Sequence, residues 1–250
     1  LGDNVALTGE GRSTATLELQ GGQLELWRRM VELGKQVVVV LINGKPLVLP
    51  HALDKTSALI EAFNPGDMGG QAIAELIFGD IEPSGRLPIS FPVHAGQQPI
   101  FYNQIRGQHG NRYADLTQEP AFAFGQGLSY SRVEYSDLQL ETATVGVDGT
   151  IRASVRVANT GDRVLTETVQ WYVRDLVTSA TWADKELKGF QKVALESGES
   201  AAVSCDLAAS SCSIVDSASV RVVEPGDFEL LVGPDSRNAS LLTARFTVVA

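Results

Sequence analysis

A glutamate between two glycines is the residue of this chain best suited to acid–base chemistry. It is Glu10, in the run "LTGEGRST" at residues 7–14. Glycines on both sides allow close approach of a ligand and leave the carboxyl group unshielded. A general acid needs such a carboxyl within hydrogen-bond reach of a leaving group. Surface turns of this composition are also common, so the motif alone leaves both a catalytic role and a simple turn open.

Other catalytic signatures are missing from the sequence. It has no Gly-x-Ser-x-Gly motif, no phosphate-binding loop and no Gly-x-Gly-x-x-Gly after a predicted strand. The histidines His51, His94 and His109 have no metal-ligand spacing with one another, a cysteine or a carboxylate, so we predict no metal site and no cofactor. The cysteines Cys205 and Cys212 favour two free thiols of a cytoplasmic protein, with a local bridge and a secreted or periplasmic location left open.

Composition excludes several kinds of partner. The chain has 250 residues, of which 44% are hydrophobic and 20% charged, an ordinary globular balance that suits two domains. A formal net charge of −10 repels phosphate backbones, which excludes nucleic acid. There is no Lys/Arg cluster for a membrane surface, and the longest apolar run, residues 37–42, is too short to span a bilayer. A homo-oligomer stays open.

The first half of the chain alternates helix-like and strand-like segments, which indicates an α/β layer structure. The run "QVVVVLIN" is nearly all β-branched and predicts a strand buried on both faces. We expect helices over 22–33 and 67–78 and strands over 36–43 and 57–63. The residues expected to form the apolar faces of the two helices are Leu26, Met30 and Leu33, and Met68, Ile73, Leu76 and Ile77.

The second half has a different pattern. Residues 82–127 are rich in Pro, Gly, Gln and Asn, which is typical of either a functional loop or a strap over the surface. From residue 134 onward, apolar and polar residues alternate in short runs separated by turn signals. About seven such strands over ~115 residues predict an antiparallel β-sandwich of immunoglobulin or fibronectin type. The clearest runs are 151–157, 168–173, 201–207 and 228–232.

Longer motifs carry a family resemblance. The runs "GKQVVVVLINGKPLVL", "IEAFNPGDMGGQAIAELIFGDIEPSGRLPISFP" and "PAFAFGQGLSYSRVEYSDL" occur in this order. Together they resemble the C-terminal half of glycoside hydrolase family 3 enzymes of the β-glucosidase type. The later runs "KELKGFQKVALESGESAAVSCDL" and "VVEPGDFELLVG" are similar to the fibronectin type III-like domain of that family.

The resemblance implies a domain arrangement. Family members of this type have an N-terminal (β/α)8 barrel, then an α/β sandwich domain, then the fibronectin-like domain. Residues 1–130 then form the C-terminal part of a three-layer, mostly parallel α/β sandwich that is incomplete at its N-terminus, with the strap at 82–127 included. Residues 131–250 form the fibronectin type III-like β-sandwich.

The resemblance also implies an activity. Such enzymes release terminal β-linked sugars with retention of configuration, using an aspartate of the barrel as nucleophile and a glutamate of the α/β sandwich as acid/base. In the β-glucosidase branch this glutamate lies in a Ser-Gly-Glu-Gly-like loop, which matches Thr8-Gly-Glu-Gly11 and assigns the role to Glu10. The chain departs from the family pattern at Arg12-Ser13-Thr14, where an Asp-Arg or Ser-Arg pair is usual. Because the nucleophile belongs to the barrel, we expect activity only together with that part.

Four further residues are candidates for sugar binding. Arg12 follows the Glu10 turn and is either a hydrogen-bond donor to sugar hydroxyls or a solvated side chain. Tyr102, Arg106 and His109 lie in the irregular segment, where they line a sugar site or, as we favour, belong to a strap.

The leading prediction is therefore the C-terminal portion of a β-glucosidase that hydrolyses terminal non-reducing β-D-glucosyl residues. A β-xylosidase or an α-L-arabinofuranosidase of the same family is an alternative, because specificity for the terminal sugar lies mostly on the barrel. A non-catalytic carbohydrate-binding or structural fragment is the second alternative.

Overall fold

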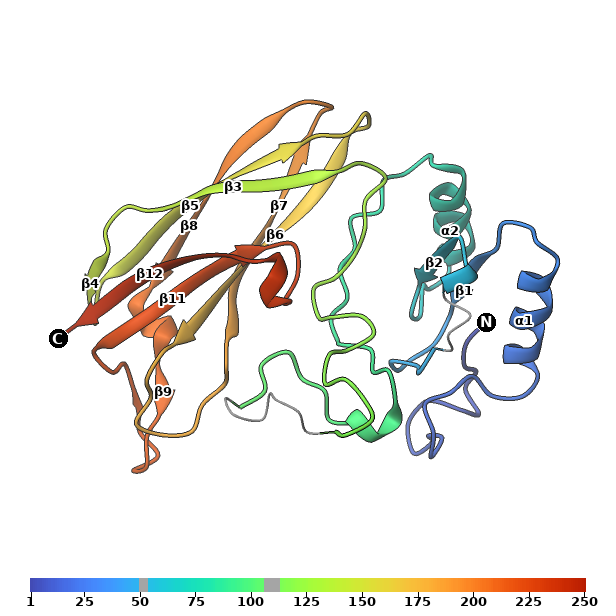
Figure 1. The fold of residues 1–250 in the computed structure, drawn as a ribbon, viewed down its shortest axis with the longest axis horizontal. Helices are drawn as coiled ribbons and strands as arrows, with labels where there is room; N and C mark the ends of the chain where they lie inside the picture. Colours follow the sequence, from blue (N-terminus) through green and yellow to red (C-terminus); the bar gives the residue numbers. More distant parts are fainter. Residues whose placement is uncertain (50–53, 106–112) are drawn as a thin grey trace. The chain divides into compact units, whose positions relative to one another are not determined.

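The computed structural model describes residues 1–49, 54–105 and 113–250 (Figure 1). By its internal contacts the chain divides into two compact units. Unit 1 consists of Leu1–Ile81, Ser90–Ile100 and Glu119–Phe122, and unit 2 consists of Glu82–Ile89, Phe101–Gln118 and Ala123–Ala250. The contacts thus divide the irregular segment between both units. The boundary at residue 130 stays a prediction from sequence.

Unit 1 is built on a short parallel sheet. Strand β1 (Val38–Leu41) pairs in parallel with β2 (Ala58–Glu61), from Val38↔Ala58 to Leu41↔Glu61. Helix α1 (Gln23–Glu32) precedes β1 and α2 (Gly69–Phe78) follows β2, and the 3-10 helix η2 (Ala95–Gln97) lies in the later part of the unit. The four elements predicted for this half are confirmed. None of the described helices is long and apolar enough to cross a membrane.

The first three residues extend this sheet on the other side of β1. The Ile42 N–H donates to the Leu1 carbonyl and the Asp3 N–H donates to the Ile42 carbonyl, both at 2.9 Å, and Gly2 forms a parallel bridge with Ile42. Residues 1–3, β1 and β2 therefore run in the same direction. Their carboxyl ends, and the loops that follow them, meet at one edge of the sheet.

The predicted apolar face of α1 is wrong. Leu26, Met30 and Leu33 are exposed, whereas Trp27 is buried and Val31, one turn later, packs with it against the sheet. The indole ring decides the orientation, because it buries more apolar area than a leucine and its N–H donates to Thr56 Oγ1 at 2.9 Å.

Two other predictions of burial in unit 1 also fail. Met68, the N-cap of α2, and Ile77 within the helix are exposed, and Ile73 and Leu76 are only partly buried. Strand β1 is buried on one face, since Val39 and Leu41 are in the core while Val38 is exposed. Burial on both faces requires a packed layer on each side, and among the described residues the core cluster covers only one.

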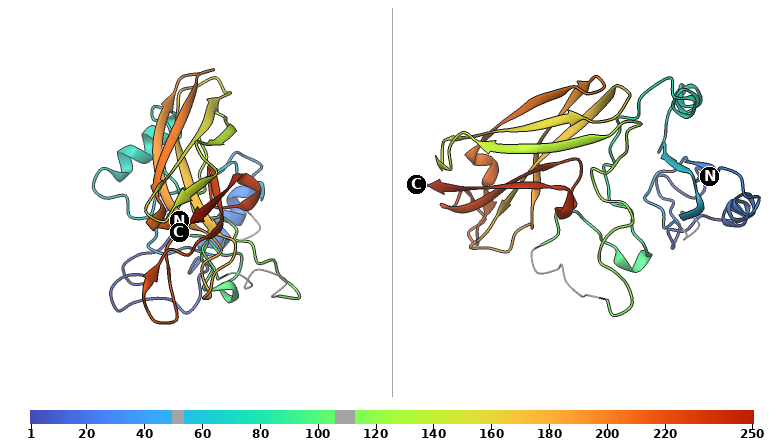
Figure 2. Two further views of the ribbon diagram at one scale, coloured as in Figure 1. Left: turned by 90° about the vertical axis from the view of Figure 1, so that its left-hand side faces the viewer. Right: turned by 45° about the horizontal axis from the view of Figure 1, so that its top comes forward.

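Unit 2 is a β-sandwich of two sheets, which Figures 1 and 2 show as separate layers. One sheet has the order β4-β12-β11-β6-β7 and the other β3-β5-β8. Pairing is antiparallel except between β12 and β4. The strands of eight or more residues are β3 (Val133–Leu140), β5 (Thr150–Asn159), β6 (Leu165–Asp175), β7 (Glu186–Leu195), β8 (Ser200–Ala208), β11 (Gly226–Gly233) and β12 (Leu242–Val249).

These seven long strands confirm the predicted antiparallel sandwich. The shorter elements of unit 2 are β4 (Thr144–Gly146), β9 (Ile214–Val215), β10 (Arg221–Val222), η3 (Ala209–Cys212) and η4 (Asn238–Ser240). Alternating side chains of both sheets form the core, in which Trp171 is buried and Phe228 stacks on Phe246 at 5.4 Å between ring centroids. Cys205 and Cys212 are free thiols, as expected, and burial raises the pKa of Cys212 to about 12.

A buried ion pair anchors the Pro-Ser-Gly-Arg-Leu-Pro run to the β-sandwich. Arg86 donates to Glu167 on β6 at 2.7 Å, and the Tyr135 hydroxyl donates to the other carboxylate oxygen at 2.8 Å. The side chains of Arg86 and Glu167 are 8% and 1% exposed. Burial raises the pKa of Glu167, while the guanidinium and the phenol act in the opposite direction. The carboxylate in this core therefore depends on Arg86 for its countercharge.

Replacing Arg86 tests this dependence. We expect Arg86→Met to lower the free energy of unfolding of unit 2 by about 3–5 kcal/mol, because it leaves a carboxylate buried without its cation. Urea unfolding followed by tryptophan fluorescence measures the change. The control is Arg152→Met, whose pairs with Glu141 and Asp206 are solvent-exposed and should contribute below ~1 kcal/mol. Equal losses in both variants would contradict the anchoring role.

Candidate active site

The carboxyl edge of the unit 1 sheet gathers three loops. Residues 4–14, with Glu10, follow the first segment; Asn43-Gly-Lys-Pro46 follows β1; and Ala62–Gly66 follows β2. Ligands of open parallel sheets bind at the carboxyl ends of the strands, where loops can present polar groups without disturbing the ladder. This edge is the candidate site.

Glu10 stands at the tip of a tight turn. The Arg12 N–H donates to the Gly9 carbonyl at 3.2 Å, and these two residues form an antiparallel bridge. Gly11, the third residue of the turn, has a φ of +67°, which a residue with a Cβ adopts at a cost. The Glu10 side chain is exposed. The glycine after it is thus needed to form the turn that presents the carboxyl.

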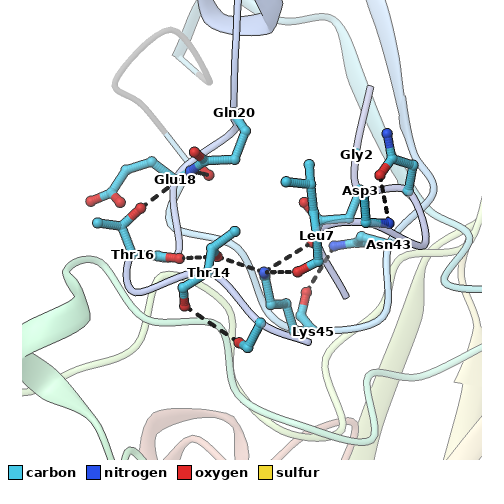
Figure 3. A network of polar contacts seen from close by, with 12 residues as sticks. Gly2, Asp3, Leu7, Thr14, Thr16, Glu18, Gln20, Asn43 and Lys45 are labelled. Atoms are coloured by element: carbon cyan, nitrogen blue, oxygen red, sulfur yellow. Dashed lines mark hydrogen bonds and ion pairs between the residues drawn. The ribbon is translucent and has the colours of Figure 1, made fainter. Parts of the chain in front are cut away.

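The ammonium group of Lys45 closes the loop that carries Glu10 (Figure 3). It donates to the Leu7 carbonyl at 3.2 Å and to Thr14 Oγ1 at 2.7 Å, so it joins the two sides of the loop. It also forms an ion pair with Asp3 at 3.4 Å. The Asp3 side chain is fully buried and that of Lys45 is 13% exposed, so this charge pair is largely shielded from water.

The turn that carries Lys45 is itself fixed. Asn43 is 1% exposed, and its side-chain N–H donates to the Lys45 carbonyl at 2.9 Å. At Gly44, a Cβ would lie 3.0 Å from Thr8 Oγ1. Glycine at this position therefore allows the Lys45 turn and the Glu10 loop to approach closely.

A second carboxyl group lies at the same edge. Glu61 is the last residue of β2, and its Oε1 accepts a hydrogen bond from the Phe63 N–H at 2.8 Å. Burial raises the pKa of Glu61 to about 7, and hydrogen bonds from Phe63 and Asn43 act in the opposite direction. Sequence reasoning missed both Glu61 and Lys45. Their position in the sequence could have indicated them, since each lies at or just after the carboxyl end of a predicted parallel strand.

The predicted binding residues are not all in one place. Arg12 is exposed at the end of the Glu10 turn. Tyr102 belongs to unit 2, where its ring stacks on Phe124 at 4.1 Å and its hydroxyl accepts from the Leu187 N–H at 3.1 Å. These contacts favour a structural role for Tyr102, as part of the strap, over a role in sugar binding. Arg106 and His109 lie outside the described residues, so their roles stay predictions. Among the described residues there is no cluster of three or more His, Cys, Asp or Glu suited to a metal ion.

Comparison with known proteins identifies the family. The model of the glycosyl hydrolase family 3 C-terminal domain matches residues 1–130, and that of the fibronectin type III-like domain matches residues 167–236. The chain belongs to glycosyl hydrolase family 3. The family 3 match contains the whole carboxyl edge of unit 1, including Glu10, Lys45 and Glu61.

Individual family 3 relatives are similar over nearly the whole chain. A β-xylosidase of Formosa agariphila is 38% identical over 99% of this chain and 35% of its own length. A periplasmic β-glucosidase of Salmonella typhimurium is 35% identical over 94% of this chain and 32% of its own length. Among solved structures, a β-glucosidase involved in saponin metabolism from intestinal bacteria has a TM-score of 0.94 at 49% identity, covering 99% of this chain and 36% of that one. A β-glucosidase of Listeria innocua in complex with glucose has a TM-score of 0.94 at 32% identity, covering 100% and 36%. The chain spans about a third of the length of the relatives it matches.

Removing the Lys45 ammonium should free the Glu10 loop. We expect Lys45→Met to increase the rate of trypsin cleavage after Arg12 by roughly tenfold or more, since loss of hydrogen bonds to a charged group favours local opening by at least about 1.4 kcal/mol. Mass spectrometry of timed digests of the protein that carries this chain measures the rate. Lys55→Met, at an exposed lysine of the same unit, is the matched control. An unchanged cleavage rate in Lys45→Met would show that the ammonium does not hold the loop.

Proposed function

We propose that this chain is the C-terminal part of a retaining exo-β-glycosidase and that Glu10 is its general acid/base. The observation that carries the proposal is the placement of Glu10: an exposed carboxyl on a glycine turn, at the carboxyl edge of a parallel sheet, in a loop closed by Lys45. Membership of glycosyl hydrolase family 3 and the similarity to β-glucosidases and β-xylosidases support the reaction class.

In this mechanism Glu10 acts twice. Protonated, it gives its proton to the glycosidic oxygen while the bond from that oxygen to the anomeric carbon breaks and a nucleophilic carboxylate bonds to the carbon. As a carboxylate, it then takes a proton from the water that displaces the nucleophile. This proton transfer returns Glu10 to its protonated form. Two inversions give net retention.

The nucleophile of this mechanism is supplied by another part of the protein. We assign it to an aspartate of an N-terminal (β/α)8 barrel, as the family resemblance implies, so that residues 1–250 would be inactive alone. The fibronectin type III-like sandwich has a packing role in this proposal, consistent with the Arg86–Glu167 anchor.

The rest of the α/β layer is part of the same proposal. We infer a three-layer, mostly parallel α/β sandwich in the complete protein, of which β1 and β2 are two strands. The parallel pairing supports it, as do the exposed apolar side chains Val38 on β1 and Ile77 and Phe78 on α2, which a further layer would cover.

The terminal sugar is proposed as β-D-glucose. Relatives named for glucosides outnumber those named for xylosides among the similar proteins described above, and the Listeria innocua relative was solved in complex with glucose. A β-xylosidase is the second candidate, favoured by the similarity to the Formosa agariphila protein.

Loss of the Glu10 carboxyl tests the assignment. In the complete protein we expect Glu10→Gln to lower kcat/KM about 10²–10⁴-fold for an aryl β-glucoside with a poor leaving group, which needs the proton. The loss should be much smaller for a dinitrophenyl β-glucoside, which departs unprotonated. Steady-state rates on the two substrates measure this, with Glu18→Gln, an exposed glutamate of the same segment, as control.

Azide provides an independent check of the second step. It should restore turnover of the dinitrophenyl substrate by Glu10→Ala and yield the β-glucosyl azide, because an anionic nucleophile needs no general base. Full activity of Glu10→Gln on the poor leaving group, or no azide product, would show that another residue is the acid/base.

A further inference from the structure

Glu61 is a buried carboxyl group that the mechanism above does not use. Its Oε2 has no hydrogen-bond partner among the described residues, and neither has the buried Oδ1 of Asn43 in the neighbouring turn. The Asn43 side chain nevertheless lies close enough to act on the Glu61 carboxyl. A buried acceptor without a donor is costly, so the contacts that Glu61 does make must offset that cost.

The other oxygen of Glu61 stabilises an unfavourable backbone conformation. Phe63 has a φ of +48°, in the left-handed region that a residue with a Cβ rarely adopts. Its N–H donates to Glu61 Oε1 at 2.8 Å, and its carbonyl accepts from the Asn43 N–H at 3.1 Å. The Glu61 carboxyl thereby orients the peptide group that receives the Asn43 backbone.

From Asn43 the contacts lead directly to the Glu10 loop. The Asn43 side chain holds the Lys45 carbonyl at 2.9 Å, and the Lys45 ammonium bonds to Leu7 and Thr14 on either side of Glu10. Every contact in this series lies within unit 1. A change at Glu61 thus reaches the Glu10 loop through two turns of backbone.

We propose that Glu61 is a positioning residue for the general acid/base: its carboxyl fixes the Phe63 turn and the Asn43–Lys45 turn, and these fix the loop of Glu10. The inference rests on the proposed function of Glu10. The acceptor oxygen that bonds the Phe63 N–H is the part of the side chain that this role requires.

The test compares three variants of Glu61 in the complete protein. Glu61→Gln keeps an acceptor oxygen for the Phe63 N–H, whereas Glu61→Ala and Glu61→Leu remove it, the second with similar volume. For each variant, kcat/KM is measured on an aryl β-glucoside with a poor leaving group and on a dinitrophenyl β-glucoside. The ratio of the two values does not depend on the fraction of folded enzyme.

We expect the ratio to fall roughly 10–100-fold in Glu61→Ala and Glu61→Leu, the usual effect of losing a group that orients a reacting one. Glu61→Gln should retain the ratio of the unsubstituted protein, and so should Glu32→Gln, an exposed glutamate on α1. An unchanged ratio in Glu61→Ala and Glu61→Leu, or an equal fall in Glu61→Gln, would overturn the proposal.

Glu10→Gln in the same assay separates this inference from the proposed function. If its ratio falls while those of Glu61→Ala and Glu61→Leu do not, only the positioning role is overturned. If the Glu10→Gln ratio is unchanged, the acid/base assignment is overturned and the positioning role with it.

Discussion

The candidate site depends on one shielded cation. The Lys45 ammonium is held by the fully buried Asp3 carboxylate and in turn holds both sides of the loop around Glu10. Each group needs the other, because a buried charge without its partner is costly. The pair connects the first segment of the sheet to the loop after β1. Because Lys45 bonds to both sides of this loop, the ends of the loop are fixed. The glycine turn at its tip then holds the Glu10 carboxyl in a defined place.

The parallel sheet explains why these groups meet. Residues 1–3, β1 and β2 run side by side in one direction, so Asp3, Asn43 and Glu61 all lie where their segments leave the sheet. Groups 38 residues apart in sequence, such as Leu7 and Lys45, thereby come into contact. The same topology leaves the tip of the Glu10 turn exposed.

Sequence patterns predicted the elements better than their orientation. Spacing correctly located α1 but selected Leu26, Met30 and Leu33 as its buried face, because periodicity weighs apolar residues equally while a buried tryptophan with a hydrogen bond dominates. The flanking glycines allowed Glu10 to be recognised from the sequence. Lys45 and Glu61 could not be recognised in this way, because their contacts depend on burial and on partners distant in sequence, which a local motif does not encode.

Because the chain belongs to glycosyl hydrolase family 3, the proposed role of Glu10 predicts a specific distance in the complete protein. A retaining glycosidase needs its two carboxyl groups about 5–5.5 Å apart. The decisive measurement is a crystal structure of the complete protein whose nucleophile has been labelled with a 2-deoxy-2-fluoroglucoside. We predict a Glu10 carboxyl oxygen about 5–5.5 Å from the labelled carboxylate. A different carboxyl at that distance, with Glu10 turned away from the sugar, would contradict the assignment.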